Sequence, residues 1–335
     1  MNPTIKDVAK QANTSKSTVS RFLNGQRVKK KTEEAIVQAI KELNYHPNMN
    51  ARRLASSRTL NIGIVVDDIS NYFYSTIISE IEVITNQHGY QCVFFSRKSN
   101  KKQEKEYLNM LYEGEVDGLI MVSFYKRDED LIAAIQEIPY PIILIGDDAG
   151  CKEVHSVDVD NYSGTYELVE YLHQIGHRNI AYIAGPDTAA ATHQRMAGYR
   201  AALQTLSIEF RPEWIVSSNW SKEGGYEAMM QLLERERRGF TAVIASNDEM
   251  AIGALRAAND RGFHVPQDFS LIGFDDIPMS AWVNPGLTTA NQPLHQIGRR
   301  AAEMMMELLK TSEMKYQRHL FKTNMVIRQS CRSLV

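Results

Sequence analysis

Four residues in one short segment near the start of the chain have the chemistry needed to contact a nucleic acid. If residues 15–23 form a helix, the short or cationic side chains Lys16, Ser17, Ser20 and Arg21 lie on its outward side. Short side chains allow close approach to a groove about 12 Å wide, and Lys and Arg donate hydrogen bonds to base acceptors and phosphates. A small helical bundle with a basic, solvent-exposed face is the alternative.

A second set of chemically capable residues follows the apolar runs in the later part of the chain. These positions are Asp67 to Phe73, Ser123 to Tyr125, Asp147 and Asp148, Pro186 to Arg195, Trp220, Asn247 and Asp248, and Asp275 and Asp276. Carboxylates, an arginine and amides can hydrogen-bond neighbouring hydroxyls, and aromatic rings can lie against the apolar face of a sugar. We therefore expect a site for a polyhydroxylated ligand. An internal ion pair is the alternative for Arg195 with Asp275, and helix capping or turn formation is favoured for Asp248 and Asp276.

Three short helices are expected to position the first set. Thr4 can cap a helix over residues 4–12, and Ser15 can cap a second one that ends at Asn24-Gly25. A third helix is expected at about residues 32–43. Their inward faces are Ile5, Val8, Ala9, Ala12, Val19, Phe22, Leu23, Ala35, Ile36, Ala39, Ile40 and Leu43. So few large apolar side chains make only a small core.

A short helical pattern at residues 49–56 follows these helices. Asn50 can start it, and Arg52 and Arg53 provide positive charge. Leu54 is a large apolar residue in a segment too short to bury it. Such a leucine can act as a wedge between base pairs in the minor groove, with the arginines on phosphates. Docking of this linker on the protein's own body is the alternative.

The charge distribution separates the first sixty residues from the rest. The chain of 335 residues has a formal net charge of -2. Residues 1–60 contain twelve Lys and Arg against four Asp and Glu, so the remaining residues carry a net charge of -10. A basic head on an acidic body favours a polyanionic partner, although a charged terminal extension without a partner would look similar.

Other kinds of site are disfavoured by the sequence. No stretch approaches the roughly 20 apolar residues of a membrane span, and no apolar leader follows Met1, so a cytoplasmic protein is expected. Cys92, Cys151 and Cys331 match no metal spacing, and "HQIGH", His173 to His177, favours packing or capping over a metal site. The P-loop, GxSxG and GxGxxG patterns are absent, and we expect no cofactor.

The head of the chain resembles the LacI/GalR family of bacterial transcription regulators. The resemblance lies in "TIKDVAKQANTSKSTVSRFLNG", "NYHPNMNARRLA" and "NIGIVV". It implies a helix-turn-helix headpiece at residues 1–46, a hinge helix and linker at 47–60, and an effector-binding, dimerising body at 61–335. The DNA contacts expected from it are Thr4, Ser15, Lys16, Ser17, Arg21, Asn24, Arg27, Asn50, Arg52 and Leu54. One departure is the loop Lys29 to Lys31 before the third helix, either a phosphate contact or a solvated loop.

Apolar runs alternate with helix-length segments from residue 61 onward, which predicts parallel sheets in two α/β subdomains. The expected strands are "NIGIVV", "YQCVFF", "VDGLIMV", "PIILIG", "NIAYIAG", "TAVIAS" and "FSLIGF". The N-subdomain is expected at about 61–160 and 292–320, and the C-subdomain at about 161–291 and 321–335. The resemblance implies a periplasmic-binding-protein-like body with its ligand between the subdomains. The expected effector contacts are Tyr72, Phe73, Ser123, Asp147, Arg195, Trp220, Asn247 and Asp275.

Together these patterns favour a homodimeric repressor of sugar-utilisation genes, without catalytic activity, that binds a palindromic operator and a mono- or disaccharide. It would be cytoplasmic and nucleoid-associated when bound to DNA. A cytosolic sugar-binding enzyme or receptor is one alternative; a glycosidase is disfavoured because the carboxylates lie beside arginine and amide partners. A regulator that responds to a purine, a nucleoside or a phosphoprotein corepressor is another. The sequence does not distinguish an inducer from a corepressor.

Overall fold

The computed structural model describes residues 3–23, 26–45, 58–96, 104–127, 129–146, 150–234, 239–311 and 315–335. The chain divides into two compact units, Met1–Thr59 and Leu60–Val335, which we describe separately as the headpiece and the body. Among the helices in these residues, none combines the length and apolarity that crossing a membrane requires.

Three helices form the headpiece: α1 (Ile5–Gln11), α2 (Lys16–Leu23) and α3 (Lys30–Glu42). Their core contains Val8, Val19 and Ile36, one fully buried side chain from each helix. This small core confirms the inward faces expected from the sequence.

Local capping fixes where the headpiece helices begin. The carboxylate of Asp7 accepts a hydrogen bond from the backbone N–H of Thr4 at 2.8 Å, and Ser15 Oγ accepts one from Thr18 N at 3.1 Å. The third helix begins earlier than expected, because the N–H of Thr32 already bonds to the carbonyl of Lys29. The expectation of a loop through Lys29 to Lys31 was therefore wrong: Lys30 and Lys31 lie in the first turn of α3.

The described strands of the body form two six-stranded sheets. The first has the order β11-β5-β4-β3-β1-β2 and the second β12-β10-β9-β8-β6-β7. The strands are β1 (Asn61–Val66), β2 (Gln91–Ser96), β3 (Gly118–Ser123), β4 (Ile142–Gly146), β5 (His155–Val159), β6 (Ile180–Ala184), β7 (Ile215–Ser217), β8 (Ala242–Ala245), β9 (Ser270–Asp275), β10 (Thr288–Asn291), β11 (Arg318–Phe321) and β12 (Asn324–Val326). All pair in parallel except β10 with β12. The seven apolar runs are therefore strands, as predicted.

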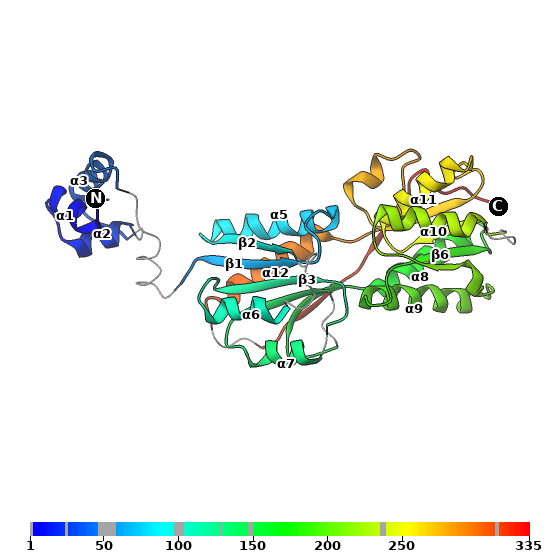
Figure 1. The fold of residues 1–335 in the computed structure, drawn as a ribbon, viewed down its shortest axis with the longest axis horizontal. Coiled ribbons are helices and arrows are strands. Elements are labelled where there is room, and N and C mark those ends of the chain that lie inside the picture. Colours follow the sequence, from blue (N-terminus) through cyan, green and yellow to red (C-terminus); the bar gives the residue numbers. More distant parts are fainter. Residues whose placement is uncertain are drawn as a thin grey trace. The chain divides into compact units, whose positions relative to one another are not determined.

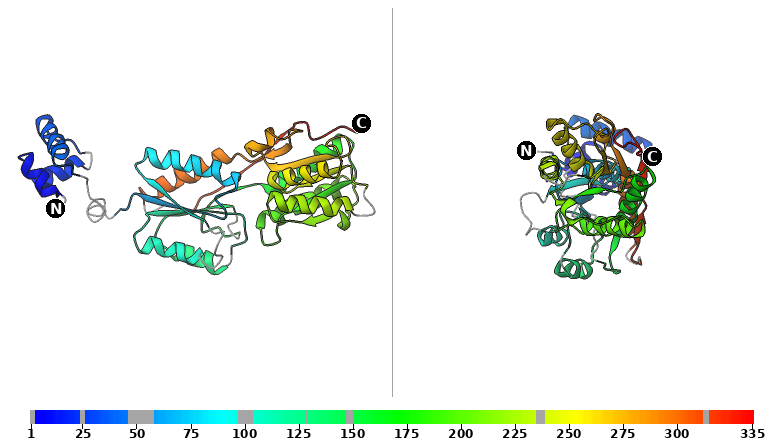
Figure 2. Two further views of the ribbon diagram at one scale, coloured as in Figure 1. Left: turned by 45° about the horizontal axis from the view of Figure 1, so that its top comes forward. Right: turned by 90° about the vertical axis from the view of Figure 1, so that its right-hand side faces the viewer.

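Helices cover both faces of each sheet (Figure 1). They are α5 (Tyr72–Gln87), α6 (Glu104–Tyr112), α7 (Glu129–Glu137), α8 (Asn161–Gln174), α9 (Ala190–Thr205), α10 (Lys222–Glu234), α11 (Asp248–Asp260) and α12 (Leu294–Leu308), with short 3-10 turns η2 (Pro212–Trp214) and η3 (Pro278–Ala281). In the first sheet α5 packs beside α12 and α6 beside α7; in the second α8 packs beside α9 and α10 beside α11. Figure 2 shows the same layers from two further directions.

The chain passes between the two sheets of the body three times. It leaves the first sheet after β5, returns after β10 through α12, and leaves it again between β11 and β12. Because α12 is late in the sequence but packs on α5, each half of the body is built from separate stretches of chain. A change in the angle between the halves can therefore be absorbed by a few connecting residues.

Candidate functional site

The headpiece presents an exposed polar face on and around α2. Exposed residues of the predicted DNA-contact set are Thr4, Ser15, Lys16, Ser17, Arg21 and Arg27. The other members, Asn24, Asn50, Arg52 and Leu54, lie outside the described residues. Val19 is fully buried on the opposite side of α2, so packing fixes which side of this helix faces outward. The arrangement leaves cationic and hydroxyl groups available on one side of the helix.

The body contains a pocket of about 410 Å³ between its two sheets. One wall comes from residues 67–74, which join β1 to α5 and include its first turn, and from Phe124 and Tyr125 after β3. The other comes from α9, residues 219–223, α11 and Asp275 at the end of β9. These positions lie at the carboxyl ends of parallel strands, where side chains from several strands converge and small ligands bind.

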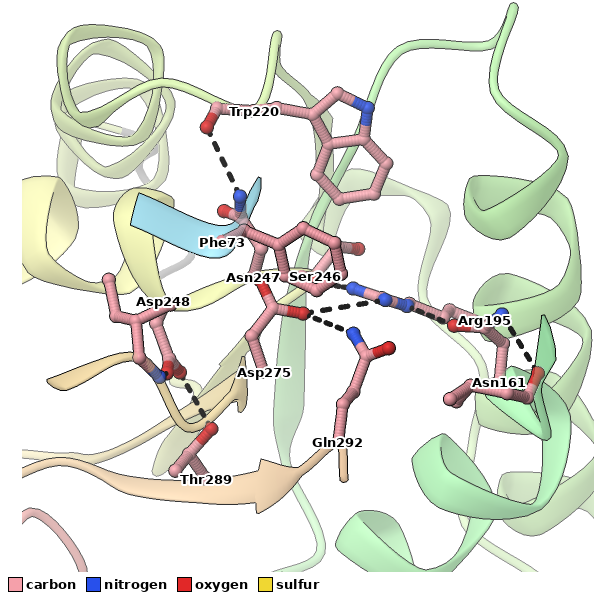
Figure 3. A network of polar contacts seen from close by, with 12 residues as sticks. Phe73, Asn161, Arg195, Trp220, Ser246, Asn247, Asp248, Asp275, Thr289 and Gln292 are labelled. Carbon is pink, nitrogen blue, oxygen red and sulfur yellow. Dashed lines mark hydrogen bonds and ion pairs between the residues drawn. The ribbon is translucent and has the colours of Figure 1, made fainter. Parts of the chain in front are cut away.

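Arg195 occupies the centre of the second wall and is almost fully buried. Its Nε donates to Asn161 Oδ1 at 2.8 Å, one terminal nitrogen donates to the carbonyl of Ser246, and the other lies 3.5 Å from the carboxylate of Asp275 (Figure 3). The guanidinium carbon lies 3.8 Å from the ring centre of Phe274. This arginine is thus held rigidly, with Asp275 as its counterion.

Asp275 is also buried, and it accepts a hydrogen bond from Gln292 Nε2 at 2.5 Å. Burial raises the pKa of its carboxyl group, while the positive charge of Arg195 acts in the opposite direction. Its backbone has a φ of 121°, and Trp220, also in the lining, has a φ of 68°. Non-glycine residues rarely adopt positive φ, and such strain tends to occur at functional sites.

Trp220 is held by both its backbone and its ring. Asn247 caps α11 by accepting from Met250 N at 2.9 Å, and its amide donates to the carbonyl of Trp220 at 3.1 Å. The indole lies against Gly185, where an added Cβ would come within 2.4 Å of the ring. The ring centre is 5.5 Å from the guanidinium carbon of Arg195. A flat apolar surface therefore adjoins the polar centre of the pocket.

The first wall combines a carboxylate with aromatic rings. Asp67 accepts hydrogen bonds from the hydroxyls of Tyr74 and Ser123, each at 2.9 Å. Phe73 packs edge-on against Phe124, with 5.1 Å between ring centres. This wall can therefore offer hydrogen-bond acceptors beside an apolar surface.

The sequence-derived effector contacts occupy different places in the body. Residues in the lining are Phe73, Arg195, Trp220, Asn247 and Asp275. Ser123 lies behind the lining and orients Asp67, Tyr72 is 48% exposed and lies outside the lining, and Asp147 falls outside the described residues. Their part in ligand binding stays a prediction.

Six lining residues were missed by the strand-end rule applied to the sequence: Tyr74, Asn219, Ser221, Lys222, Glu223 and Glu249. Most lie in the first turns of helices, one or more residues beyond the strand ends. The N-terminal boundaries of α10 and α11 were the signal that could have found Lys222, Glu223 and Glu249.

Two other aspartates have structural roles in the body. Asp248 accepts from Ile277 N, Ser280 Oγ and Thr289 Oγ1, so it ties α11 to η3 and to β10. The helix cap favoured for it was wrong, because Asn247 caps α11. The carboxylate of Asp276 forms an ion pair with Arg328, with 2.7 Å between Oδ1 and the terminal nitrogen Nη2.

The "HQIGH" segment is also structural. His177 is fully buried against the hydroxyls of Thr241 and Ser270 and the carbonyl of Arg332. Across the described parts of the chain, no group of three or more His, Cys, Asp or Glu side chains is arranged to hold a metal ion.

A short backbone bridge joins the two walls at one edge of the pocket. Tyr125 and Ala189 pair in antiparallel fashion. Lys126 N donates to Thr188 O at 2.8 Å, and Ala190 N donates to Phe124 O at 3.0 Å. Because the partners belong to different halves of the body, these bonds hold the halves in one relative position.

The sequence matches two family descriptions. Residues 4–48 match "Bacterial regulatory proteins, lacI family", and residues 169–331 match "Periplasmic binding protein-like domain". The repressor PurR of Haemophilus influenzae is 34% identical over 338 residues, with 99% of each chain covered.

Two solved structures extend the similarity to the fold. A lac repressor dimer bound to operator and an anti-inducer matches with a TM-score of 0.89 at 30% identity, covering 99% of this chain and all of that one. A complex of the regulator CelR with cellobiose matches with a TM-score of 0.74 at 31% identity, covering 98% and 99% of the two chains.

Proposed function

Because this chain belongs to the LacI family of bacterial regulatory proteins, we propose that it represses transcription under the control of a small polyhydroxylated ligand. The observation that carries the proposal is the pairing of a headpiece with an exposed cationic helix and a body with a polar, two-walled pocket. The boundaries that we propose are 1–46 for the headpiece, 47–60 for the linker and 61–335 for the body. The body would divide into subdomains at about 61–160 with 292–320, and 161–291 with 321–335.

The headpiece supplies the DNA contacts in this proposal. Lys16, Ser17 and Arg21 on α2 would contact base edges in the major groove, and Thr4 and Arg27 would contact the phosphate backbone. Two copies would bind the two halves of a palindromic operator, and the similar lac repressor, solved as a dimer bound to operator, supports a dimer on DNA. The protein would act in the cytoplasm and associate with the nucleoid when bound to DNA.

A sugar is the ligand that the pocket supports best. The carboxylates of Asp67 and Asp275 would accept hydrogen bonds from neighbouring hydroxyls, Asn247 would contribute its amide, and Trp220 would lie against an apolar ring face. The similar regulator CelR was solved with cellobiose, which supports this class. A purine or nucleoside stacked on Trp220 is the second candidate.

Regulation rather than catalysis is proposed for the pocket. Asp275 is engaged by Arg195 and Gln292, and Asp67 accepts from two hydroxyls, so both carboxylates are held as hydrogen-bonding groups. A general acid needs instead a carboxyl group that can deliver its proton to a leaving group. Ligand binding to both walls would select one angle between the halves and so change how the two headpieces fit the operator.

The test is a selection of bound fragments from random duplex DNA at fixed salt, repeated with a panel of mono- and disaccharides, purines and nucleosides. The expected result is a palindromic motif whose recovery changes with one sugar. The fragments selected with the Arg21→Ala variant should not be enriched in this motif. Failure to enrich any motif would contradict the regulator assignment and favour an enzyme or receptor. If recovery of the motif changes only with a purine or nucleoside, that compound replaces the sugar as the proposed effector.

A further inference from the structure

The pocket lining is rich in acidic side chains. Among the described lining residues, the carboxylates are those of Asp67, Asp68, Glu223, Glu249 and Asp275, and the cations are those of Arg195 and Lys222. Carboxylates exceed cations by three, and an excess remains even if one buried carboxyl group is protonated. The potential inside the pocket is therefore negative.

Each of these cations already faces a carboxylate. Arg195 faces Asp275 at 3.5 Å, and its Nε and one terminal nitrogen donate to Asn161 and Ser246. One face of the guanidinium lies on the ring of Phe274. A second anion would have to compete with a carboxylate that is fixed in place by burial and by Gln292.

Lys222 also faces a carboxylate, although its side chain is half-exposed. Its Nζ lies 3.5 Å from Glu249 Oε2, and the Glu249 side chain is only 9% exposed while that of Lys222 is 49% exposed. The buried partner is the carboxylate, so the lysine serves to compensate its charge. Anion sites are built with the opposite balance, because they place Arg or Lys donors in excess of nearby carboxylates.

We infer that this pocket selects ligands without net negative charge: free sugars or nucleosides, and not their phosphorylated or carboxylated forms. The inference rests on the proposed function of the pocket as an effector site, and it adds the charge class of the effector. One like charge about 8 Å away at an effective dielectric constant near 20 corresponds to about a 30-fold weaker Kd. A phosphate, with nearly two charges, should be rejected more strongly.

The test is calorimetric titration of the full chain with matched pairs: cellobiose and its aldonic acid, glucose and glucose 6-phosphate, ribose and ribose 5-phosphate, adenosine and adenosine monophosphate. In any pair with measurable binding, the neutral member should bind at least about 30-fold more tightly. An anionic member that binds as tightly as its neutral partner overturns the inference. Neutral nucleosides binding where sugars do not would contradict the proposed sugar and leave the charge selection intact. Absence of binding by every compound overturns both.

A charge variant tests the cause. Glu249→Gln removes one acidic group and releases Lys222, so the preference for the neutral member should shrink by about 3- to 10-fold. Glu209→Gln is the matched control, because Glu209 pairs with Arg211 at 2.7 Å on the exposed surface. An unchanged preference in Glu249→Gln, with the same unfolding temperature as the control, would show that the lining charges do not set it.

Discussion

Asp275→Asn is the substitution whose effect the structure defines most closely. Asparagine has the shape of aspartate, so we expect it to occupy the same backbone conformation at this position, where φ is 121°. What it removes is the negative charge 3.5 Å from the buried guanidinium of Arg195. The variant therefore isolates the cost of leaving a buried cation without its counterion.

Loss of one partner of a buried ion pair typically costs about 3–5 kcal/mol. We expect the lower end, about 3 kcal/mol, because the amide oxygen of the new residue still faces the guanidinium. In large domains each kcal/mol lowers the unfolding temperature by about 2–4 °C, so a decrease of roughly 6–12 °C is expected for the body. All three tryptophans, at positions 214, 220 and 282, lie in the body, so their fluorescence reports its unfolding.

Two comparisons make this measurement decisive. Asp260→Asn breaks the exposed pair with Arg256, at 2.9 Å, and should cost less than about 1 kcal/mol. Combining Asp275→Asn with Arg195→Met removes both charges and should recover part of the lost stability. A change below about 1 °C in Asp275→Asn would refute the reasoning, since it would mean that the buried guanidinium does not need its counterion.

Three further predictions concern single side chains. Ligand should change the tryptophan fluorescence of the wild type, and this response should be lost in Trp220→Phe and kept in Trp282→Phe, because Trp220 lines the pocket whereas Trp282 is 84% exposed and lies outside it. Arg21→Ala should weaken operator binding at least about tenfold in gel-shift titrations, while Arg256→Ala on the body surface should not. Burial lowers the pKa of His177 below its ordinary value of 6.5, so the folded state resists the proton that the unfolded state accepts and stability falls as the pH drops below that value. In His177→Asn, urea unfolding should depend less steeply on pH between about 7 and 5 than in the wild type.

Seven of the described strands were predictable because buried parallel strands are continuous apolar runs. "NIGIVV" and "PIILIG" consist almost wholly of apolar residues, which favours burial of the whole segment, and they form β1 and β4. The strands β5, β7, β10, β11 and β12 were not recognised, since three to five residues, some of them polar, carry little pattern and their pairing depends on neighbours distant in sequence. Local pattern therefore identified the continuous apolar strands, including β2 at a sheet edge, and not the shorter or partly polar strands.

The site shows the same division. Asp275 could be chosen from sequence because it directly follows an apolar run, and Arg195 because it ends the segment 186–195 that follows another. Their ion pair, which was the alternative to ligand contact, is present at 3.5 Å. Phe73 lines the pocket and its neighbour Tyr72 does not, because adjacent residues of a helix point about 100° apart and the start of α5 decides which one faces inward. Glu249 escaped notice because its proximity to Lys222 depends on how α10 and α11 pack.

The backbone bridge at the pocket edge offers a direct test of whether the two halves must stay joined for ligand binding. Ala190 is the first residue of α9, where proline is well tolerated, and Ala189 before it has the extended conformation that proline requires (φ -98°, ψ 127°). Ala190→Pro should thus keep the helix and remove only the N–H that donates to Phe124 O. The lost hydrogen bond should reduce by about 1 kcal/mol the stability of the arrangement in which the two halves are bridged. The Kd for ligand, measured by calorimetry, should then rise about fivefold. Ala190→Ser retains the N–H and should bind as the wild type does; equal Kd values for the proline and serine variants would show that the bridge does not contribute to ligand binding.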